Sequence, residues 1–182
     1  LSFKNHHREK ESLLNDQEKL KTINKVTLHI NKSKEWKEAI ESLQWIFSKL
    51  GRVLDLKIDF AFKSYAKDVL EALIQQNNTW ATSDLLEFTI DLSASRIEDQ
   101  HAIQLYERAI SKMVNIEKLE IVLENTNITN KSVKAFADSA LPNLASLTDF
   151  RFNVNYTKIS NDGMENLFTS FHKRKKNLTG LA

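Results

Sequence analysis

The sequence contains no cysteine, a single proline and only three glycines, and it has no long uninterrupted apolar run. Without cysteine the chain has no disulfide framework, no thiolate metal ligand and no thiol nucleophile. No stretch approaches the ~18 apolar residues that a membrane span needs, and none has the pattern of a signal peptide. We therefore expect no membrane partner and a reducing, cytoplasmic setting.

The chain also has little excess charge, because 26 basic and 24 acidic residues give a net charge of +2. Such a balance does not favour nucleic acid as a partner. The isolated glycines Gly51, Gly163 and Gly180 form no phosphate-cradling loop. The five histidines lack metal-ligand spacing, and no HExxH, GxSxG or EF-hand motif occurs. We expect a protein that is not an enzyme and holds no metal and no cofactor.

What the sequence does contain is an internal period. Six segments follow one order: apolar, two residues, apolar, one residue, apolar, one residue, apolar. They are INKVTLHI from Ile23, VLDLKIDF from Val53, LLEFTIDL from Leu85, IEKLEIVL from Ile116, LTDFRFNV from Leu147 and the incomplete LTGL from Leu178. Their first residues stand 30, 32, 31, 31 and 31 positions apart. This regular spacing indicates a repeat architecture.

The same period continues beyond these segments. An apolar residue recurs 20 positions after each complete start, at Leu43, Leu73, Leu105, Phe136 and Leu167. Alternating apolar residues predict a strand in the first part of each unit, and the helical spacing that follows predicts a helix packed on it. Polar residues that can cap a helix predict its start at Ser33, Ser64, Asp99, Asn130 and Ser160 or Asn161. The basic run from His172 to Lys176 would then stabilise the last turn of the fifth helix.

Other strand–helix or repeat architectures fit less well. Strands of a doubly wound nucleotide-binding fold are apolar on both faces, whereas here every second residue of LDLKIDF and EFTIDL is polar. Tetratricopeptide and ankyrin repeats have similar periods but lack an alternating strand segment in each unit.

The strand–helix order, the LxxLxL-like strand core and the period of about 30 residues resemble the ribonuclease-inhibitor-like class of leucine-rich repeats. The resemblance implies an α/β solenoid (horseshoe) with a parallel β-sheet on the concave side and helices on the convex side. It covers residues 23–182, as five repeats starting at 23, 53, 85, 116 and 147 plus the start of a sixth at 178. Residues 1–22 are expected to form a helix of a preceding repeat or a cap, so the chain reads as a segment of a longer protein.

The chain departs from this family at the ninth repeat position, where Asn or Cys usually joins neighbouring loops. Asn31 and Asn155 fit the pattern, whereas Ala61, Ser93 and Glu124 do not. We therefore expect no continuous asparagine ladder.

Strand alternation places the third, fifth and seventh residue of each unit on the concave face. These residues are Lys25, Thr27, His29, Asp55, Lys57, Asp59, Glu87, Thr89, Asp91, Lys118, Glu120, Val122, Asp149, Arg151 and Asn153. The predicted partner-binding set within them is Lys57, Asp59, Glu87, Thr89, Asp91, Glu120, Val122, Arg151 and Asn153. Its mixed but locally acidic character favours a protein partner with a basic surface over a phosphate backbone.

The resemblance implies a non-catalytic protein-binding scaffold that is a segment or subunit of a larger protein or assembly. The expected location is cytoplasmic, with cytoskeletal and ciliary assemblies as candidates. An alternative comes from activators of the small GTPase Ran, which use this repeat class and present an arginine from a strand-to-helix loop. Arg96 lies in such a loop, and its charge would act on the transferring phosphate.

Overall fold

The computed structural model describes residues 2–3, 24–29, 37, 40–41, 47, 53–61, 64–75 and 84–179. The strands are β1 (Ser2–Phe3), β2 (Lys25–His29), β3 (Asp55–Asp59), β4 (Glu87–Asp91), β5 (Lys118–Val122) and β6 (Asp149–Asn153). The helices are α4 (Ala66–Gln75), α5 (Asp99–Arg108), α6 (Asn130–Ala135) and α7 (Asn161–Thr179). Strands and helices alternate, which makes this an α/β protein. The predicted positions Asn31, Ser33 and Leu43 lie outside the described residues.

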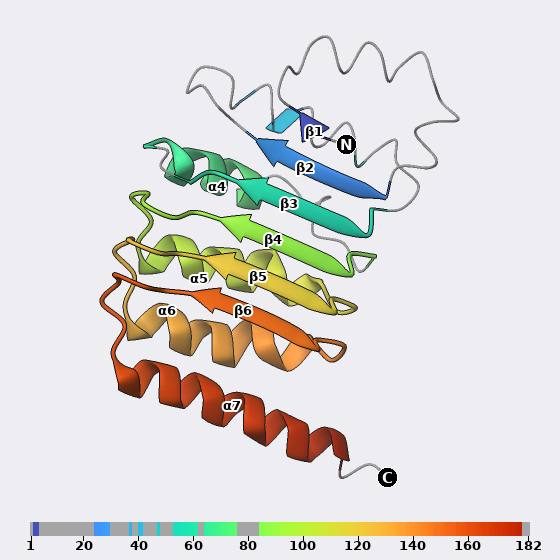
Figure 1. Cartoon of the computed structure of the whole chain (residues 1–182), viewed down its shortest axis with the longest axis vertical. Helices are drawn as coiled ribbons and strands as arrows, with labels where there is room; N and C mark the ends of the chain where they lie inside the picture. The colour runs from blue at the N-terminus through green and yellow to red at the C-terminus, as the bar shows by residue number, and fades with distance from the viewer. Residues whose placement is uncertain are drawn as a thin grey trace.

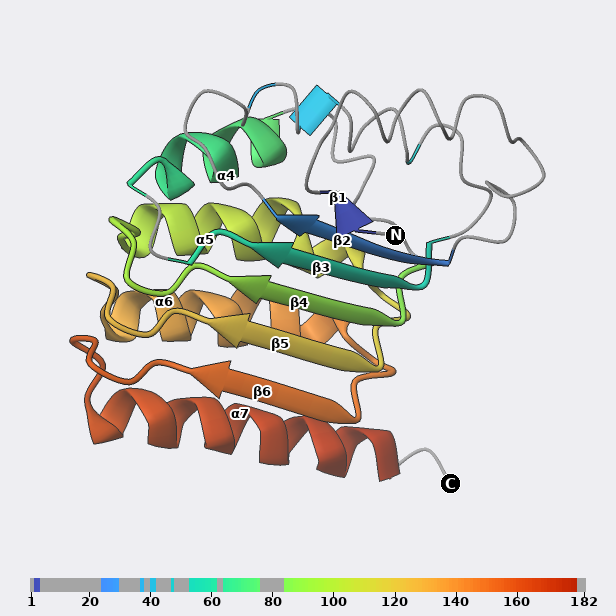
Figure 2. The ribbon, with the colours of Figure 1, turned by 45° about the horizontal axis from the view of Figure 1, so that its top comes forward.

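The strands form one parallel sheet in chain order, β1-β2-β3-β4-β5-β6. Each strand follows its predecessor down the molecule in Figure 1, and Figure 2 shows the helices behind them in the same order. The register pairs Ile58 with Ile90, Ile90 with Ile121, and Ile121 with Phe152. These residues share the sixth position of the sequence alignment, so their predicted row is confirmed.

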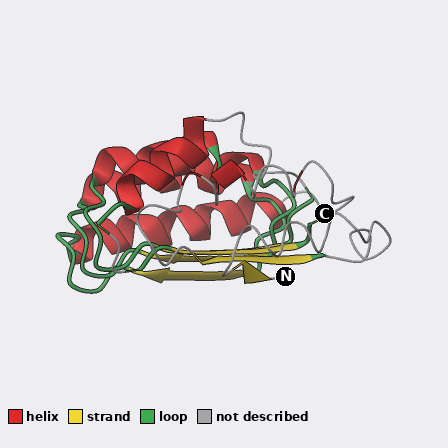
Figure 3. Ribbon diagram, turned by 90° about the horizontal axis from the view of Figure 1, so that it is seen from above, coloured by secondary structure: helices red, strands yellow, loops and turns green. Residues whose placement is uncertain are grey.

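The described helices lie on one face of the sheet (Figure 3). Alternate strand residues point into the space between the two layers and form the core, for example Leu56, Ile58, Phe88 and Ile90. The predicted helix anchors complete this core from the other side: Leu73, Leu105, Phe136 and Leu167 are all buried. Burying one such side chain stabilises the fold by about 1.5–3 kcal/mol.

The strand-to-helix turns repeat one conformation. Ala94, Asn125 and Tyr156 occupy the same repeat position with φ of 49°, 53° and 57°. One residue later, the hydroxyls of Ser95, Thr126 and Thr157 donate to the carbonyl oxygens of Leu92, Leu123 and Val154. Backbone bonds of 2.8 Å join consecutive turns, from Ala94 N to Glu124 O and from Asn125 N to Asn155 O. Because backbone groups join the turns here, these units need no asparagine side chain at the ninth position.

The helix starts at Asp99, Asn130 and Asn161 are confirmed, but the capping role predicted for the first two is wrong. The residue before each helix is the N-cap, namely Glu98 and Thr129. The Asp99 carboxylate instead accepts hydrogen bonds from Thr129 N and Thr129 Oγ1, both at 2.7 Å. Asn130 binds the corresponding residue of the next unit: its Oδ1 accepts from Ser160 N (2.9 Å) and its Nδ2 donates to Ser160 Oγ (2.8 Å). The helix α4 begins at Ala66, two residues after the predicted Ser64.

Two further boundaries differ from the prediction. α7 continues to Thr179, so Leu178 is helical rather than the first residue of a sixth strand segment, and the basic run from His172 begins well inside the helix. Lys173, Arg174, Lys175 and Lys176 are good helix formers, and no glycine or proline follows them before Gly180. At the other end Ser2–Phe3 pairs with β2 as a strand rather than a helix. The rest of residues 1–22 lies outside the described part.

Tyr106 is a fully buried polar residue of α5. Its ring meets Phe136 edge-on, with 5.2 Å between the ring centroids. The hydroxyl has no hydrogen-bond partner among the described residues. Burial, with a smaller contribution from the Asp99 carboxylate, raises the pKa of Tyr106 far above its ordinary value of 10.0.

Tyr106→Phe is expected to raise the free energy of unfolding by about 1 kcal/mol, because it removes a buried donor without a partner. The wild type should also lose stability above pH 10, by about 1.4 kcal/mol per pH unit, because only the unfolded state then gives up the Tyr106 proton. The variant should lack this loss. Denaturant unfolding of both proteins between pH 7 and 11 tests this, and parallel pH curves would contradict it.

Candidate binding surface

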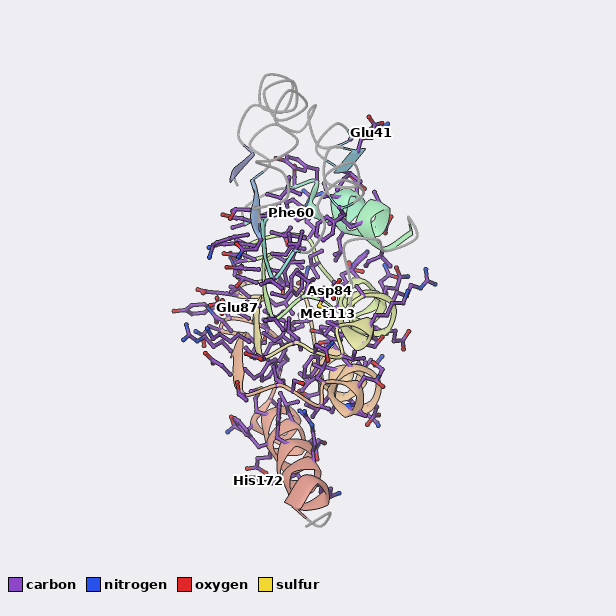
Figure 4. All side chains as sticks on the ribbon, turned by 90° about the vertical axis from the view of Figure 1, so that its right-hand side faces the viewer. Glu41, Phe60, Asp84, Glu87, Met113 and His172 are labelled. Atoms are coloured by element: carbon purple, nitrogen blue, oxygen red, sulfur yellow. The ribbon has the colours of Figure 1, made fainter. Side chains whose placement is uncertain are left out.

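The candidate surface is the face of the sheet that the described helices leave uncovered, called here the open face. In Figure 4 side chains project from the strands on the side away from the helices, Glu87 among them. The register arranges these side chains in three rows across the strands. The amino row is Lys25, Asp55, Glu87, Lys118 and Asp149; the middle row is Thr27, Lys57, Thr89, Glu120 and Arg151; the carboxyl row is Asp59, Asp91, Val122 and Asn153.

The amino row forms ion pairs within the protein. Lys25 Nζ contacts Asp55 Oδ2 on the next strand, and Lys118 Nζ lies 2.5 Å from Glu87 Oε1. These hydrogen bonds raise the pKa of both lysines. Lys118 thus offsets the negative charge of Glu87. Exposed pairs of this kind add little to stability. Their main effect is on the distribution of charge over the open face.

Residues of the middle and amino rows line a shallow depression over β4, β5 and β6, with a volume of about 260 Å³. Thr89 Oγ1 lies 3.4 Å from Glu120 Oε2, and Arg151 lies 3.4 Å from Asp149 of its own strand. Four residues of the predicted binding set therefore meet here: Glu87, Thr89, Glu120 and Arg151. Lys118 and Asp149 also line the depression. Both lie at the third repeat position, which places them on this face, but the predicted binding set does not include them.

The carboxyl row ends the strands. The Oδ1 atoms of Asp59, Asp91 and Asn153 each accept a hydrogen bond from the backbone N–H two residues later, at 3.2, 2.9 and 3.1 Å. This structural role was not predicted, although the recurrence of Asp or Asn at the seventh repeat position is a signal for it. Because Asn153 makes the same bond as the two aspartates, the role requires the oxygen and not the charge.

The remaining residues of the predicted binding set lie outside the depression, in the middle and carboxyl rows. Lys57 is exposed in the middle row, beside Thr89. Val122 is half-buried at the end of β5. It occupies the seventh repeat position, where β3, β4 and β6 have Asp or Asn. Asn153 also donates from Nδ2 to Glu124 Oε2, at 2.8 Å. All nine residues of the predicted set therefore lie on the open face.

Arg96, the residue of the alternative function, is exposed in the turn between β4 and α5. It does not line the depression on the open face. A role toward a GTPase stays a prediction of the sequence resemblance.

In the described part of the chain no group of three or more His, Asp or Glu residues is placed to hold a metal ion. His101 instead has a structural role: it is buried in α5, and its Nδ1 accepts a hydrogen bond from Glu98 N at 3.0 Å. Nor is any described helix long and apolar enough to cross a membrane. No protein-family model and no curated protein matches the chain.

Proposed function

We propose that the chain is a leucine-rich-repeat solenoid of the ribonuclease-inhibitor-like class that serves as a non-catalytic protein-binding scaffold. Three features support this proposal. Units of about 31 residues stack with equivalent residues in register. Their turns share one conformation, and their helices cover one sheet face only. Such stacking leaves a long uncovered surface, which repeat proteins of this kind use for binding.

The open face carries the functional part of the proposal. Its described rows contain six acidic and four basic side chains. Three of the bases, Lys25, Lys118 and Arg151, pair with acids of the amino row. Asp59, Asp91 and Glu120 lie on the three adjacent strands β3, β4 and β5, where acidic side chains outnumber basic ones on this face. A protein partner with basic groups would complement this excess of carboxylates, whereas a nucleic-acid backbone would be repelled.

The setting proposed for this scaffold is a larger cytoplasmic protein or assembly, with cytoskeletal and ciliary assemblies as candidates. The support is the same open face: it extends over β2 to β6, and a partner in an assembly can contact several units of it at once.

Replacing Asp59 and Asp91 together with asparagine is expected to reduce partner capture at least about tenfold, since charged interface groups contribute 1.4 kcal/mol or more when a partner desolvates them. Asparagine keeps the Oδ1 acceptor, as Asn153 does, so the unfolding free energy should change by less than about 0.5 kcal/mol. Quantitative mass spectrometry of proteins captured by the immobilised chain from its native cells measures the effect.

Glu107→Gln with Glu165→Gln is the matched control, because it also removes two exposed carboxylates but from the helices. The control should capture the wild-type set of proteins. If the asparagine variant keeps that set while remaining folded, the carboxyl row of the open face is not the binding site. Substitution by lysine is a poorer test, because it would also remove the strand-ending hydrogen bonds of Asp59 and Asp91.

A further inference from the structure

The depression on the open face, marked by Glu87 in Figure 4, is lined by five charged side chains from β4, β5 and β6. Lys118 pairs with Glu87 at 2.5 Å. Arg151 pairs with Asp149 of its own strand at 3.4 Å. The fifth is Glu120, half-buried in the middle of β5. In the described part of the chain no basic side chain pairs with Glu120, so the depression keeps one negative charge that the chain does not offset.

The contact that the Glu120 carboxylate does make is weak. Thr89 Oγ1 lies 3.4 Å from Glu120 Oε2, whereas a normal O–H···O hydrogen bond measures about 2.5–3.0 Å. A carboxylate has two oxygens that can accept about four hydrogen bonds. Most of this capacity is therefore left for a group from outside the chain. Because Glu120 is half-buried, a cation that reaches it interacts more strongly than one at a fully exposed carboxylate.

Arg151 is the cation best placed in sequence to pair with Glu120. The register sets the two residues directly opposite each other on β5 and β6, and opposite charges at such positions attract. The Arg151 guanidinium instead contacts Asp149 Oδ2, two residues earlier on the same strand. This contact holds Arg151 at the side of the depression and away from Glu120. Asp149 is therefore a positioning residue that keeps the Glu120 carboxylate accessible.

The size and floor of the depression suit a single flat side chain. Its volume of about 260 Å³ lies below the roughly 300–1,000 Å³ of sites for small molecules. Phe88 and Leu119, whose side chains are buried in the core, also line it, so its floor is the sheet itself. An arginine fits this shape because its guanidinium is planar and can bond both oxygens of one carboxylate. A lysine ammonium is more strongly hydrated and offers no such fork.

We propose that the depression receives one arginine side chain of a protein partner, whose guanidinium binds the Glu120 carboxylate between the two internal ion pairs. The proposal rests on the proposed function, since it names the group that a partner of the open face inserts. It also gives the face a specificity. A partner with a neutral residue at this point would cover the Glu120 carboxylate without pairing it, at a cost in binding.

The first experiment uses a blocked pentapeptide with a central arginine between glycines as the probe. Nuclear magnetic resonance titration of the isotope-labelled chain should show saturable shifts of the Thr89 and Glu120 amides, with a dissociation constant on the order of millimolar. The same peptide with citrulline has the shape without the charge and should cause no shift. The lysine peptide should bind more weakly. No shift with arginine, or equal binding of citrulline or lysine, would overturn the proposal.

The second experiment changes the site. Glu120→Gln should weaken binding of the arginine peptide at least about tenfold. Asp149→Asn should also weaken it, because the released Arg151 then competes for Glu120. Adding Arg151→Gln to Asp149→Asn removes the competitor and should restore wild-type affinity. Glu107→Gln is the control, since this carboxylate is exposed on α5 and its loss should change nothing. Circular dichroism checks that each variant is folded.

Arginine binding that persists in Glu120→Gln overturns the proposal. If the Asp149→Asn variant binds like the wild type, or if adding Arg151→Gln fails to restore its affinity, the positioning role of Asp149 is overturned. These results are separate from the test of the proposed function, because the Asp59 and Asp91 variant leaves Glu120 unchanged. Lost partner capture in that variant, together with no arginine binding here, would overturn the arginine site and leave the scaffold function in place.

Discussion

Replacing Ile90 with alanine is expected to lower the free energy of unfolding by about 2–5 kcal/mol, the largest stability loss expected here. Ile90 is fully buried in β4, between Ile58 of β3 and Ile121 of β5. The truncation leaves a cavity inside a row that runs across neighbouring strands, and neither neighbour can move without losing its own register. Denaturant unfolding followed by circular dichroism measures the loss.

Ile90→Val serves as the control, because it removes one methylene group and should cost about 0.5–1.5 kcal/mol. If packing of the Ile90 side chain causes the loss of stability, the alanine variant should lose clearly more than the valine variant. A loss below about 0.5 kcal/mol for the alanine variant would contradict the placement of Ile90 in the row.

Asp99→Ala is expected to cost about 2–3 kcal/mol, since hydrogen bonds to a charged group contribute about 1.5–3 kcal/mol and a half-buried donor is left without a partner. The Asp99 carboxylate holds both Thr129 N and Thr129 Oγ1. Thr129 in turn caps α6 by accepting from Lys131 N. The variant should therefore loosen the start of α6 as well as its link to α5, which amide hydrogen exchange of residues 130–133 will measure.

Asp99→Asn is the matched control, because Asn130 forms the corresponding two bonds to Ser160 with an amide. It should retain most of the stability, with a loss below about 1 kcal/mol. Equal losses for alanine and asparagine would mean that the negative charge near the start of α5, and not the link to Thr129, is the important property of Asp99.

Much of the sheet could be predicted from the sequence because its cause is local and repeated. Alternating apolar residues decide which face of a strand is buried, and one step of register reverses that face. Because the pattern occurs in five copies, it predicts the register in which Ile58, Ile90 and Ile121 lie side by side. The helix anchors Leu73, Leu105 and Leu167 followed from the same period.

The boundaries were less predictable because they depend on contacts between units. Asp99 and Asn130 have the residue types of N-caps, and only the neighbouring unit shows that their side chains bind Thr129 and Ser160 instead. The pattern of LTGL matches a strand start, yet Leu178 lies in α7. The four residues of LTGL are too few to outweigh the helix that the preceding run Lys173–Lys176, all good helix formers, continues.

For the candidate surface, alternation predicted which side chains lie on the open face, but not how they interact. Pairing of Glu87 with Lys118 depends on residues that are 31 positions apart in sequence and adjacent in space. The role of Asp91 in ending its strand depends on the conformation of the turn to Ser93. A sequence pattern does not contain these geometries.

The stacked strand-to-helix turns have a consequence for how this architecture can change in length. From each strand start to its helix anchor the count is the same, as in Val53 to Leu73 and Leu85 to Leu105. At this edge the left-handed residues Ala94, Asn125 and Tyr156 and their stacked backbone bonds leave no place for an extra residue. At the opposite edge, where helices return to strands, the two described units differ: a 3₁₀ turn follows α5, whereas a π turn and a 3₁₀ turn follow α6. We therefore expect insertions and deletions to be tolerated better at that edge, while the strand-to-helix edge keeps the units aligned.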